Sequence, residues 1–163
     1  MNPKIVTIGV YGFDKDSFFQ ALLNANIDTF CDIRLRRGMR GSSYSFANSE
    51  SLQLCLRELG IRYVHVKDLA PNQEIRKKQK QEDEKLGVAK RSRKGLGQEF
   101  IQAYEKECLS NFDSSKFISD VGPDAKIIGL FCVEREPNAC HRSLAANKLA
   151  QDLNLLVENV IPF

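Results

Sequence analysis

The chain has little of what membrane-spanning and secreted proteins contain. No apolar run in its 163 residues approaches the roughly 20 residues that a membrane-spanning helix needs, so no membrane partner is expected. Residues 1–4 lead directly into a short strand-like stretch, without the apolar segment and small-residue cleavage site of a secretory signal. The five cysteines show no close paired spacing, which is typical of reduced thiols rather than of a disulfide framework. We therefore expect a cytoplasmic protein.

The glycine signatures of several nucleotide-binding folds are also absent. The sequence has neither a dinucleotide fingerprint nor a Walker loop, and no glycine-rich cradle runs from a cysteine to an arginine as in phosphatase loops. It contains no internal repeat and no low-complexity segment. The net charge of +3 and the pI near 8.6 permit nucleic-acid binding, but this pI lies below the value of about 9 that would indicate it. No particular cofactor is predicted.

The length suits one sizeable hydrophobic core, and the pattern alternates strands with helices. Strand-like apolar stretches cover residues 4–9, 27–33, 61–66, 126–132 and 155–160. Apolar residues at helical spacing follow Asp14, Ser49, Phe100 and Arg142. Strands separated by helices favour a parallel sheet, because parallel neighbours need crossover connections. We predict an α/β fold with a Rossmann-like parallel sheet flanked by helices, in a single domain over residues 1–163.

One segment interrupts this alternation. Residues 73–85 are almost wholly charged or amide-bearing, which predicts a solvated helix with ion pairs at helical spacing. Lys90, Arg91, Arg93 and Lys94 follow within a stretch bounded by glycines, which predicts a basic loop. We interpret residues 73–97 as a charged, partly flexible insertion. Both a solvated surface without a partner and a contact with nucleic-acid phosphates remain open for it.

The stretch richest in chemistry is residues 127–144. An apolar strand leads to a break at Pro137 and Asn138, after which a helix begins with Cys140, His141 and Arg142. In open α/β sheets, ligands bind at the carboxyl ends of the strands, and a helix N-terminus there offers N–H groups to an anion. A thiol in this first turn, beside an imidazole and a guanidinium, has reason to ionise. This stretch therefore predicts a site without naming its reaction.

Four groups of motif residues span nearly the whole chain. They are Thr7-Ile8-Gly9, Asp32-Ile33-Arg34, Gly60-Ile61-Arg62-Tyr63, and Cys132-Val133-Glu134 with Cys140-His141-Arg142. In their order and spacing they resemble the domain of unknown function 488 family. The resemblance implies a Rossmann-like α/β domain and no established reaction. The chain departs from the family pattern in two loops, with Val10-Tyr11-Gly12 in place of an early small hydroxyl residue and Asp68-Leu69-Ala70-Pro71 in place of paired glycines.

In a parallel sheet these strand ends meet at one crevice. The candidate general acids or bases and the candidate nucleophile follow two of these strands or begin the last helix. The candidate catalytic residues are Asp32, Glu134, Cys140 and His141. Arginine side chains can clamp a carboxylate or phosphate in bidentate fashion. The candidate substrate-binding residues are Gly9, Arg34, Arg36 and Arg142.

Each candidate also has a structural interpretation. Asp32 could form a buried ion pair with Arg34 or Arg142, and His141 could cap or pack near the helix start. A second set of residues is expected to serve packing or strand structure, namely Cys31, Cys55, Cys108, Cys132 and His65.

A metal site is considered but not predicted. Cys132, Cys140, His141 and an acidic residue could supply four ligands, but adjacent residues on a helix diverge by about 100°, which separates Cys140 from His141. The preferred function is a hydrolase or group transferase acting on a nucleotide, a nucleic-acid end or another phosphate-bearing metabolite. The alternative is a non-catalytic nucleic-acid-binding or interaction module, whose affinity would fall steeply with salt. Neither the oligomeric state nor enzymatic activity itself is fixed by the sequence.

Overall fold

The computed structural model describes residues 2–89 and 94–162 and has a five-stranded, wholly parallel sheet as its centre. The strand order is β3-β2-β4-β1-β5. The strands are β1 (Lys4–Ile8), β2 (Thr29–Asp32), β3 (Arg62–His65), β4 (Ile127–Phe131) and β5 (Val157–Val160). Each is slightly shorter than its apolar stretch, although backbone hydrogen bonds continue just past the strand ends, as from the Val66 amide to the Asp32 carbonyl at 2.9 Å. The predicted α/β fold with a parallel sheet flanked by helices is confirmed.

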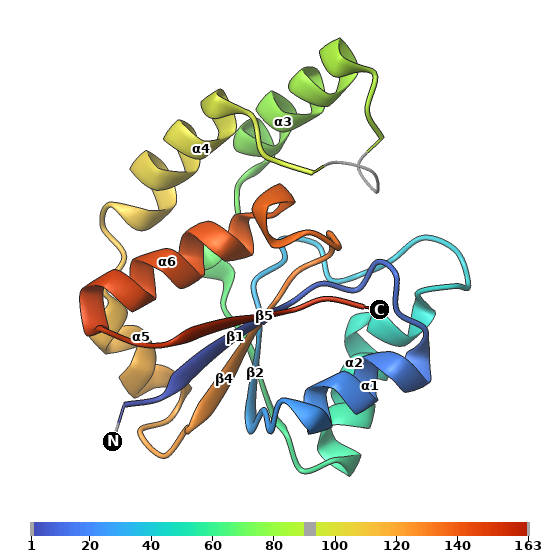
Figure 1. Cartoon of the computed structure of the whole chain (residues 1–163), viewed down its shortest axis with the longest axis vertical. Coiled ribbons are helices and arrows are strands. Elements are labelled where there is room, and N and C mark those ends of the chain that lie inside the picture. Colours follow the sequence, from blue (N-terminus) through green and yellow to red (C-terminus); the bar gives the residue numbers. More distant parts are fainter. Residues whose placement is uncertain (1, 90–93, 163) are drawn as a thin grey trace.

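Six α-helices cover the sheet within the described residues. They are α1 (Lys15–Asn24), α2 (Ser49–Glu58), α3 (Gln73–Leu86), α4 (Gln98–Tyr104), α5 (Ser114–Val121) and α6 (His141–Leu153). Figure 1 shows α1 and α2 on one side of the sheet and α3 to α6 on the other. None of the described helices is both long enough and apolar enough to cross a membrane.

Helix α5 was not predicted from the sequence. Its N-cap is Asp113, whose carboxylate accepts a hydrogen bond from the Lys116 amide at 2.9 Å. Phe117 and Val121 are buried one helical turn apart. The helix is only two turns long, which leaves too few apolar positions to show a clear period in the sequence.

Helix α1 is fixed at both its start and its buried face. Asp14 and Ser17 form a reciprocal capping box, in which the Asp14 carboxylate accepts from the Ser17 amide at 2.8 Å. The Phe18 ring lies 5.5 Å, centroid to centroid, from the rings of Phe46 and Phe131. This aromatic cluster packs α1 against the centre of the sheet at β4.

The charged segment 73–97 is more tightly joined to the fold than a solvated helix would be. Three residues of α3 at four-residue spacing are buried, namely Ile75, Gln79 and Asp83. The Gly97 amide donates to Gln79 Oε1 at 2.7 Å, α3 packs against α4, and α4 packs against α6. The predicted basic loop falls largely on residues 90–93, which lie outside the described residues.

The position of β4 sets up the site. It lies between β1 and β2, so the connection after β1 leads to β2 on one side of β4, and the connection after β4 leads to β5 beyond β1 on the other side. The carboxyl ends of β1, β4 and β2 are therefore neighbours, and the start of α6 returns to the same edge. This is the place where open α/β sheets bind ligands.

Candidate functional site

The end of β2 carries a buried ion pair. Arg34 donates to Asp32 in bidentate fashion, from Nε to Oδ1 at 2.9 Å and from Nη2 to Oδ2 at 2.8 Å. Asp32 is 0% exposed and Arg34 is 2% exposed. The Arg34 guanidinium also lies 4.8 Å from the centre of the Phe131 ring, a cation–π contact. Of the two roles open to Asp32, the observed contacts are those of an ion pair that holds Arg34 in place.

Tyr63 on β3 completes this pair. Its hydroxyl donates to Asp32 Oδ2 at 2.8 Å and accepts from Arg37 Nη1 at 3.3 Å. Burial, together with the nearby Asp32 carboxylate, raises the pKa of Tyr63, so its hydroxyl remains a donor. Tyr63 was not among the predicted site residues. Its place beside Asp32 depends on strand pairing, where it lies opposite Phe30 on β2.

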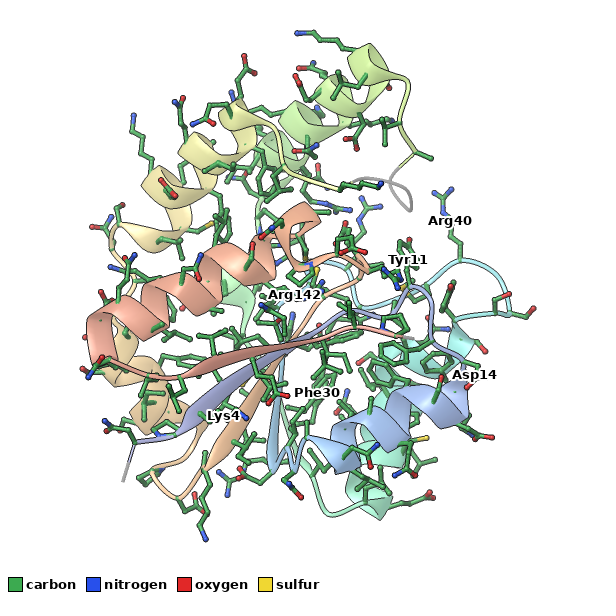
Figure 2. The ribbon with its side chains drawn as sticks, viewed as in Figure 1. Lys4, Tyr11, Asp14, Phe30, Arg40 and Arg142 are labelled. Atoms are coloured by element: carbon green, nitrogen blue, oxygen red, sulfur yellow. The ribbon has the colours of Figure 1, made fainter. Side chains whose placement is uncertain are left out.

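Arg142 joins α6 to the loop after β4. It is 0% exposed and donates to two backbone carbonyls, from Nη1 to Glu134 at 2.5 Å and from Nη2 to Arg135 at 3.1 Å. Figure 2 shows Arg142 between α6 and the sheet. The guanidinium thus fixes the backbone of the 134–135 turn against the helix start.

Gly9, the first residue after β1, is needed for close approach. A Cβ atom there would lie 1.8 Å from the Glu134 carbonyl oxygen and 2.9 Å from Arg142 Nη1. The next two amides, of Val10 and Tyr11, both donate to the Val133 carbonyl at 3.0 Å. The loops after β1 and β4 are therefore in direct contact at this edge.

Cys132, Cys140 and His141 form a compact buried cluster. His141 Nδ1 lies 3.7 Å from the Sγ atom of each cysteine, and His141 Nε2 lies 2.8 Å from the Ile33 carbonyl oxygen. A carbonyl only accepts, so Nε2 carries a proton and Nδ1 faces the two sulfurs. The cluster thus links the ends of β2 and β4 to the start of α6.

The backbone at Cys140 explains how adjacent residues reach one point. Cys140 is the N-cap residue of α6 and has extended dihedrals, φ −136° and ψ 148°, whereas His141 is the first helical residue. The expected divergence of about 100° applies only when both residues are helical. The spacing argument against a shared site therefore does not hold for this pair.

The charge state of the cluster follows from its contacts. Burial alone would raise the pKa of Cys140, but the contacts with Cys132, His141 and Arg142 outweigh it and hold that pKa well below its ordinary value. Burial likewise opposes protonation of His141, but the Cys140 sulfur and the Ile33 carbonyl raise its pKa. The direction of both shifts is that of a thiolate beside an imidazolium.

The structure gathers most of the predicted site residues but not all of them. Gly9, Glu134, Cys140, His141 and Arg142 lie together, and Ile33 connects them to the pair of Asp32 and Arg34. Glu134 is buried, and its charge acts on His141. Arg36 is exposed on the loop after β2, outside this buried group.

The residues expected to be structural differ in their surroundings. Cys31 is fully buried, as predicted, whereas Cys55 and Cys108 are only partly buried. His65 Nε2 lies 2.9 Å from the Arg34 carbonyl oxygen, so this histidine supports the loop after β2. Cys132 does more than pack, because its sulfur contacts His141. Its position immediately after β4 was the sequence signal for this.

The carboxyl edge is closed by its own side chains. Cys140 is 1% exposed, and the arginines beside it are no more than 2% exposed. Two surface hollows of the described residues lie elsewhere. One is at the amino ends of the strands, around Arg62 and Asp124, and the other lies between β3 and α5, around Lys67 and Lys116.

One of three comparisons with known proteins agrees with the motifs on these strands. No curated protein and no solved structure matches the chain. The family model described as "Domain of unknown function DUF488" matches residues 14–149, which include Asp32, Glu134 and the Cys140-His141-Arg142 turn. This match covers well over half of the sequence. The chain therefore belongs to the DUF488 family.

Proposed function

We propose that the carboxyl edge of the sheet binds a phosphate-bearing ligand and that the chain is a hydrolase or group transferase acting on it. The ligand class is a nucleotide, a nucleic-acid end or another phosphate-bearing metabolite. The proposal rests on one observation, the meeting of the Cys140–His141 pair with two buried arginines at this edge.

The arginines supply the support for anion binding. Arg34 Nη1 and Arg142 Nε are buried and have no hydrogen-bond acceptor among the described residues. A buried donor without an acceptor costs about 1–3 kcal/mol, which an anionic ligand would recover. No side chain caps the N-terminus of α6, whose backbone N–H groups and dipole also favour an anion.

The chemistry follows from the cluster. The Cys140 sulfur attacks phosphorus and forms a thiophosphate, and the bond from phosphorus to the leaving-group oxygen breaks as that oxygen takes a proton from His141. Water then releases the phosphate and restores the thiol, and in this proposal Glu134 is the general base that accepts the proton of that water. Asp32 acts by positioning Arg34. Because Cys140 is 1% exposed, substrate entry requires the closed carboxyl edge to open.

The test combines binding with turnover. Inorganic phosphate, adenosine monophosphate and a 5′-phosphorylated oligonucleotide are titrated calorimetrically, and phosphate release from phosphate esters is followed. Cys140→Ser should retain phosphate binding and lose turnover, and His141→Asn should lose turnover by about 100-fold or more. Cys55→Ser, a partly buried thiol on α2, is the matched control and should behave as wild type.

Two results would contradict the proposal. One is a wild-type protein that neither binds these probes nor releases phosphate. The other is turnover that Cys140→Ser leaves unchanged. Binding of DNA or RNA that falls steeply with salt, without turnover, would instead support the nucleic-acid-binding alternative.

A further inference from the structure

The three side chains around His141 Nδ1 have the arrangement of metal ligands. The potential ligand atoms of Cys132, Cys140 and His141 lie within 4.8 Å of one another. A tetrahedral zinc ion with Zn–S bonds of about 2.3 Å and a Zn–N bond of about 2.1 Å places sulfur and nitrogen ligands about 3.6 Å apart. The two observed Nδ1 to Sγ distances are both 3.7 Å. Both sulfur-to-nitrogen distances therefore already fit such an ion, and the two sulfurs lie within 4.8 Å of each other.

The orientation of His141 is a second, independent indication. A histidine that ligates a metal through one nitrogen usually donates its other N–H to a carboxylate or a backbone carbonyl, which fixes its tautomer. His141 Nε2 donates to the Ile33 carbonyl at 2.8 Å, and the Tyr104 ring packs edge-on against the imidazole at 5.4 Å. Nδ1 is therefore held toward the two sulfurs before any ion arrives.

The charge balance of the buried cluster also favours a cation. All three residues are buried. Two thiolates and a neutral imidazole carry two negative charges, which a divalent ion neutralises in a place where an uncompensated charge is costly. Soft sulfur ligands with imidazole select zinc-like ions over magnesium or calcium.

We propose that Cys132, Cys140 and His141 bind a single zinc-class divalent cation, with the fourth coordination position left to water or an anionic ligand. The ion joins the end of β4 to the start of α6 and, through Ile33, to the end of β2. Binding replaces the thiol protons by the metal, so one ion releases protons to solvent.

The ion would also control the proposed reaction. If the Cys140 sulfur is the attacking group, as the proposed function states, then a bound ion occupies that sulfur and blocks attack. The zinc-loaded protein would be the resting form and the metal-free, reduced protein the active one. Only this consequence rests on the proposed function; metal binding itself does not.

The experiment uses the whole chain, stripped of metal and reduced with a phosphine. Cobalt(II) is titrated as a spectroscopic probe, and zinc affinity is measured by competition with a chromophoric chelator. We expect one equivalent of cobalt with a sulfur-to-metal charge-transfer band and the intense visible bands of tetrahedral coordination. X-ray absorption of the zinc form should show two sulfur ligands, with nitrogen or oxygen atoms as the remaining ligands. Zinc should also raise the melting temperature.

Variants then locate the site. Cys132→Ser and Cys140→Ser should each weaken zinc binding by more than the roughly 10–100-fold that loss of an outer partner costs. Cys108→Ser is the matched control, because this partly buried thiol lies outside the cluster, and it should keep wild-type affinity. If a variant unfolds, the cobalt spectrum and X-ray absorption of the wild type still decide the question.

The metal site is overturned if the wild type binds no stoichiometric ion, if the bound ion has no sulfur ligand, or if Cys132→Ser and Cys140→Ser bind zinc as tightly as Cys108→Ser. The two proposals fail separately. If the protein binds zinc but the metal-free protein does not turn over phosphate esters, the metal site stands and the proposed function is wrong. If turnover requires Cys140 but the protein binds no zinc, the proposed function stands and the metal site is wrong.

Discussion

Arg34 and Asp32 form a bidentate ion pair at the end of β2 in which both partners are almost wholly removed from solvent. Asp32 is the last residue of the strand, and Arg34 lies two residues beyond it. The backbone amide of Arg34 also donates to Asp32 Oδ1 at 3.2 Å. The pair therefore shapes the loop as well as balancing the buried charge.

Asp32→Asn should destabilise the protein by about 3–5 kcal/mol, because it leaves the Arg34 guanidinium buried without a counter-charge. Replacing both partners with apolar residues, in Asp32→Leu with Arg34→Met, should recover a large part of that loss. Urea unfolding followed by circular dichroism measures the difference. The exposed pair of Lys116 and Asp120 is the control, and Asp120→Asn should leave the unfolding midpoint unchanged. A cost for Asp32→Asn as small as this control would show that the buried pair contributes nothing.

Gly9→Ala should be one of the most damaging single-methyl additions in the chain. The new methyl group would overlap the Glu134 carbonyl at 1.8 Å, and backbone on both sides must move. Overpacking of this kind typically costs about 1–3 kcal/mol, occasionally more. Gly95→Ala is the matched control, since a Cβ there meets nothing within 4 Å. Equal melting temperatures for the two variants would rule out the close approach of the loops after β1 and β4.

Cys31 should make the protein more sensitive to alkali. Burial, and secondarily the Asp32 charge, raises the pKa of Cys31 from its ordinary 9.0 to about 12. Its thiol ionises in the unfolded chain first, so the contribution is complete below pH 9 and is lost as the pH rises toward 12. Between these values, the free energy of unfolding should fall by roughly 1.4 kcal/mol per pH unit from this group alone.

The measurement for Cys31 compares slopes rather than absolute stabilities. Urea unfolding of wild type and Cys31→Ala is followed from pH 8 to pH 11, and the variant should show the shallower decline. The same change at the partly buried Cys55 is the control and should leave the wild-type slope. Parallel slopes for wild type and Cys31→Ala would mean that Cys31 ionises in the folded protein as it does in the unfolded one.

Tyr104→Phe should lower the stability of the protein without changing zinc binding through His141. The buried Tyr104 hydroxyl of α4 donates to the Leu69 carbonyl at 2.7 Å. Its loss leaves that carbonyl without this donor and should cost about 1–3 kcal/mol in unfolding experiments. The ring is kept, so the contact with His141 and the zinc affinity should not change. Weaker zinc binding by Tyr104→Phe than by wild type would show that the hydroxyl, rather than the ring, supports the histidine.

The elements of the fold were predictable because their signals are local. Apolar stretches mark β1 and β4, Asp14 marks the start of α1, and Gly60, at φ +72°, marks the turn after α2. The buried stripe of α3 was less visible. Gln79 and Asp83 are polar, and the Gln79 side-chain amide donates to the Asp83 carboxylate at 2.8 Å. A pattern of apolar residues cannot reveal buried polar positions of this kind.

The gathering of the candidate site residues at one edge was predictable, but their contacts were not. A parallel sheet was enough to bring Asp32, Glu134 and Cys140 to one edge. Which partner Asp32 takes, however, depends on the Tyr63 hydroxyl reaching it from β3, and sequence distance carries no information about that. The contact between Cys140 and His141 depended on an extended residue at the helix start, whose two backbone dihedrals neither periodicity nor spacing determines.

The place of β4 between β1 and β2 has a consequence for how the chain is made. The pairing of Thr29 with Ile128 joins residues 99 positions apart, and β1 and β2 have no direct contact as sheet neighbours. A ribosome-bound chain that has not yet released residues 127–131 holds two strands with unpaired edges. Unpaired strand edges promote aggregation. Pairing strands that are far apart in the sequence also slows folding, because the long intervening loop must be closed first. The newly synthesised protein should therefore depend on chaperone protection until residues 127–131 emerge, and should fold only then, around the strand that arrives late.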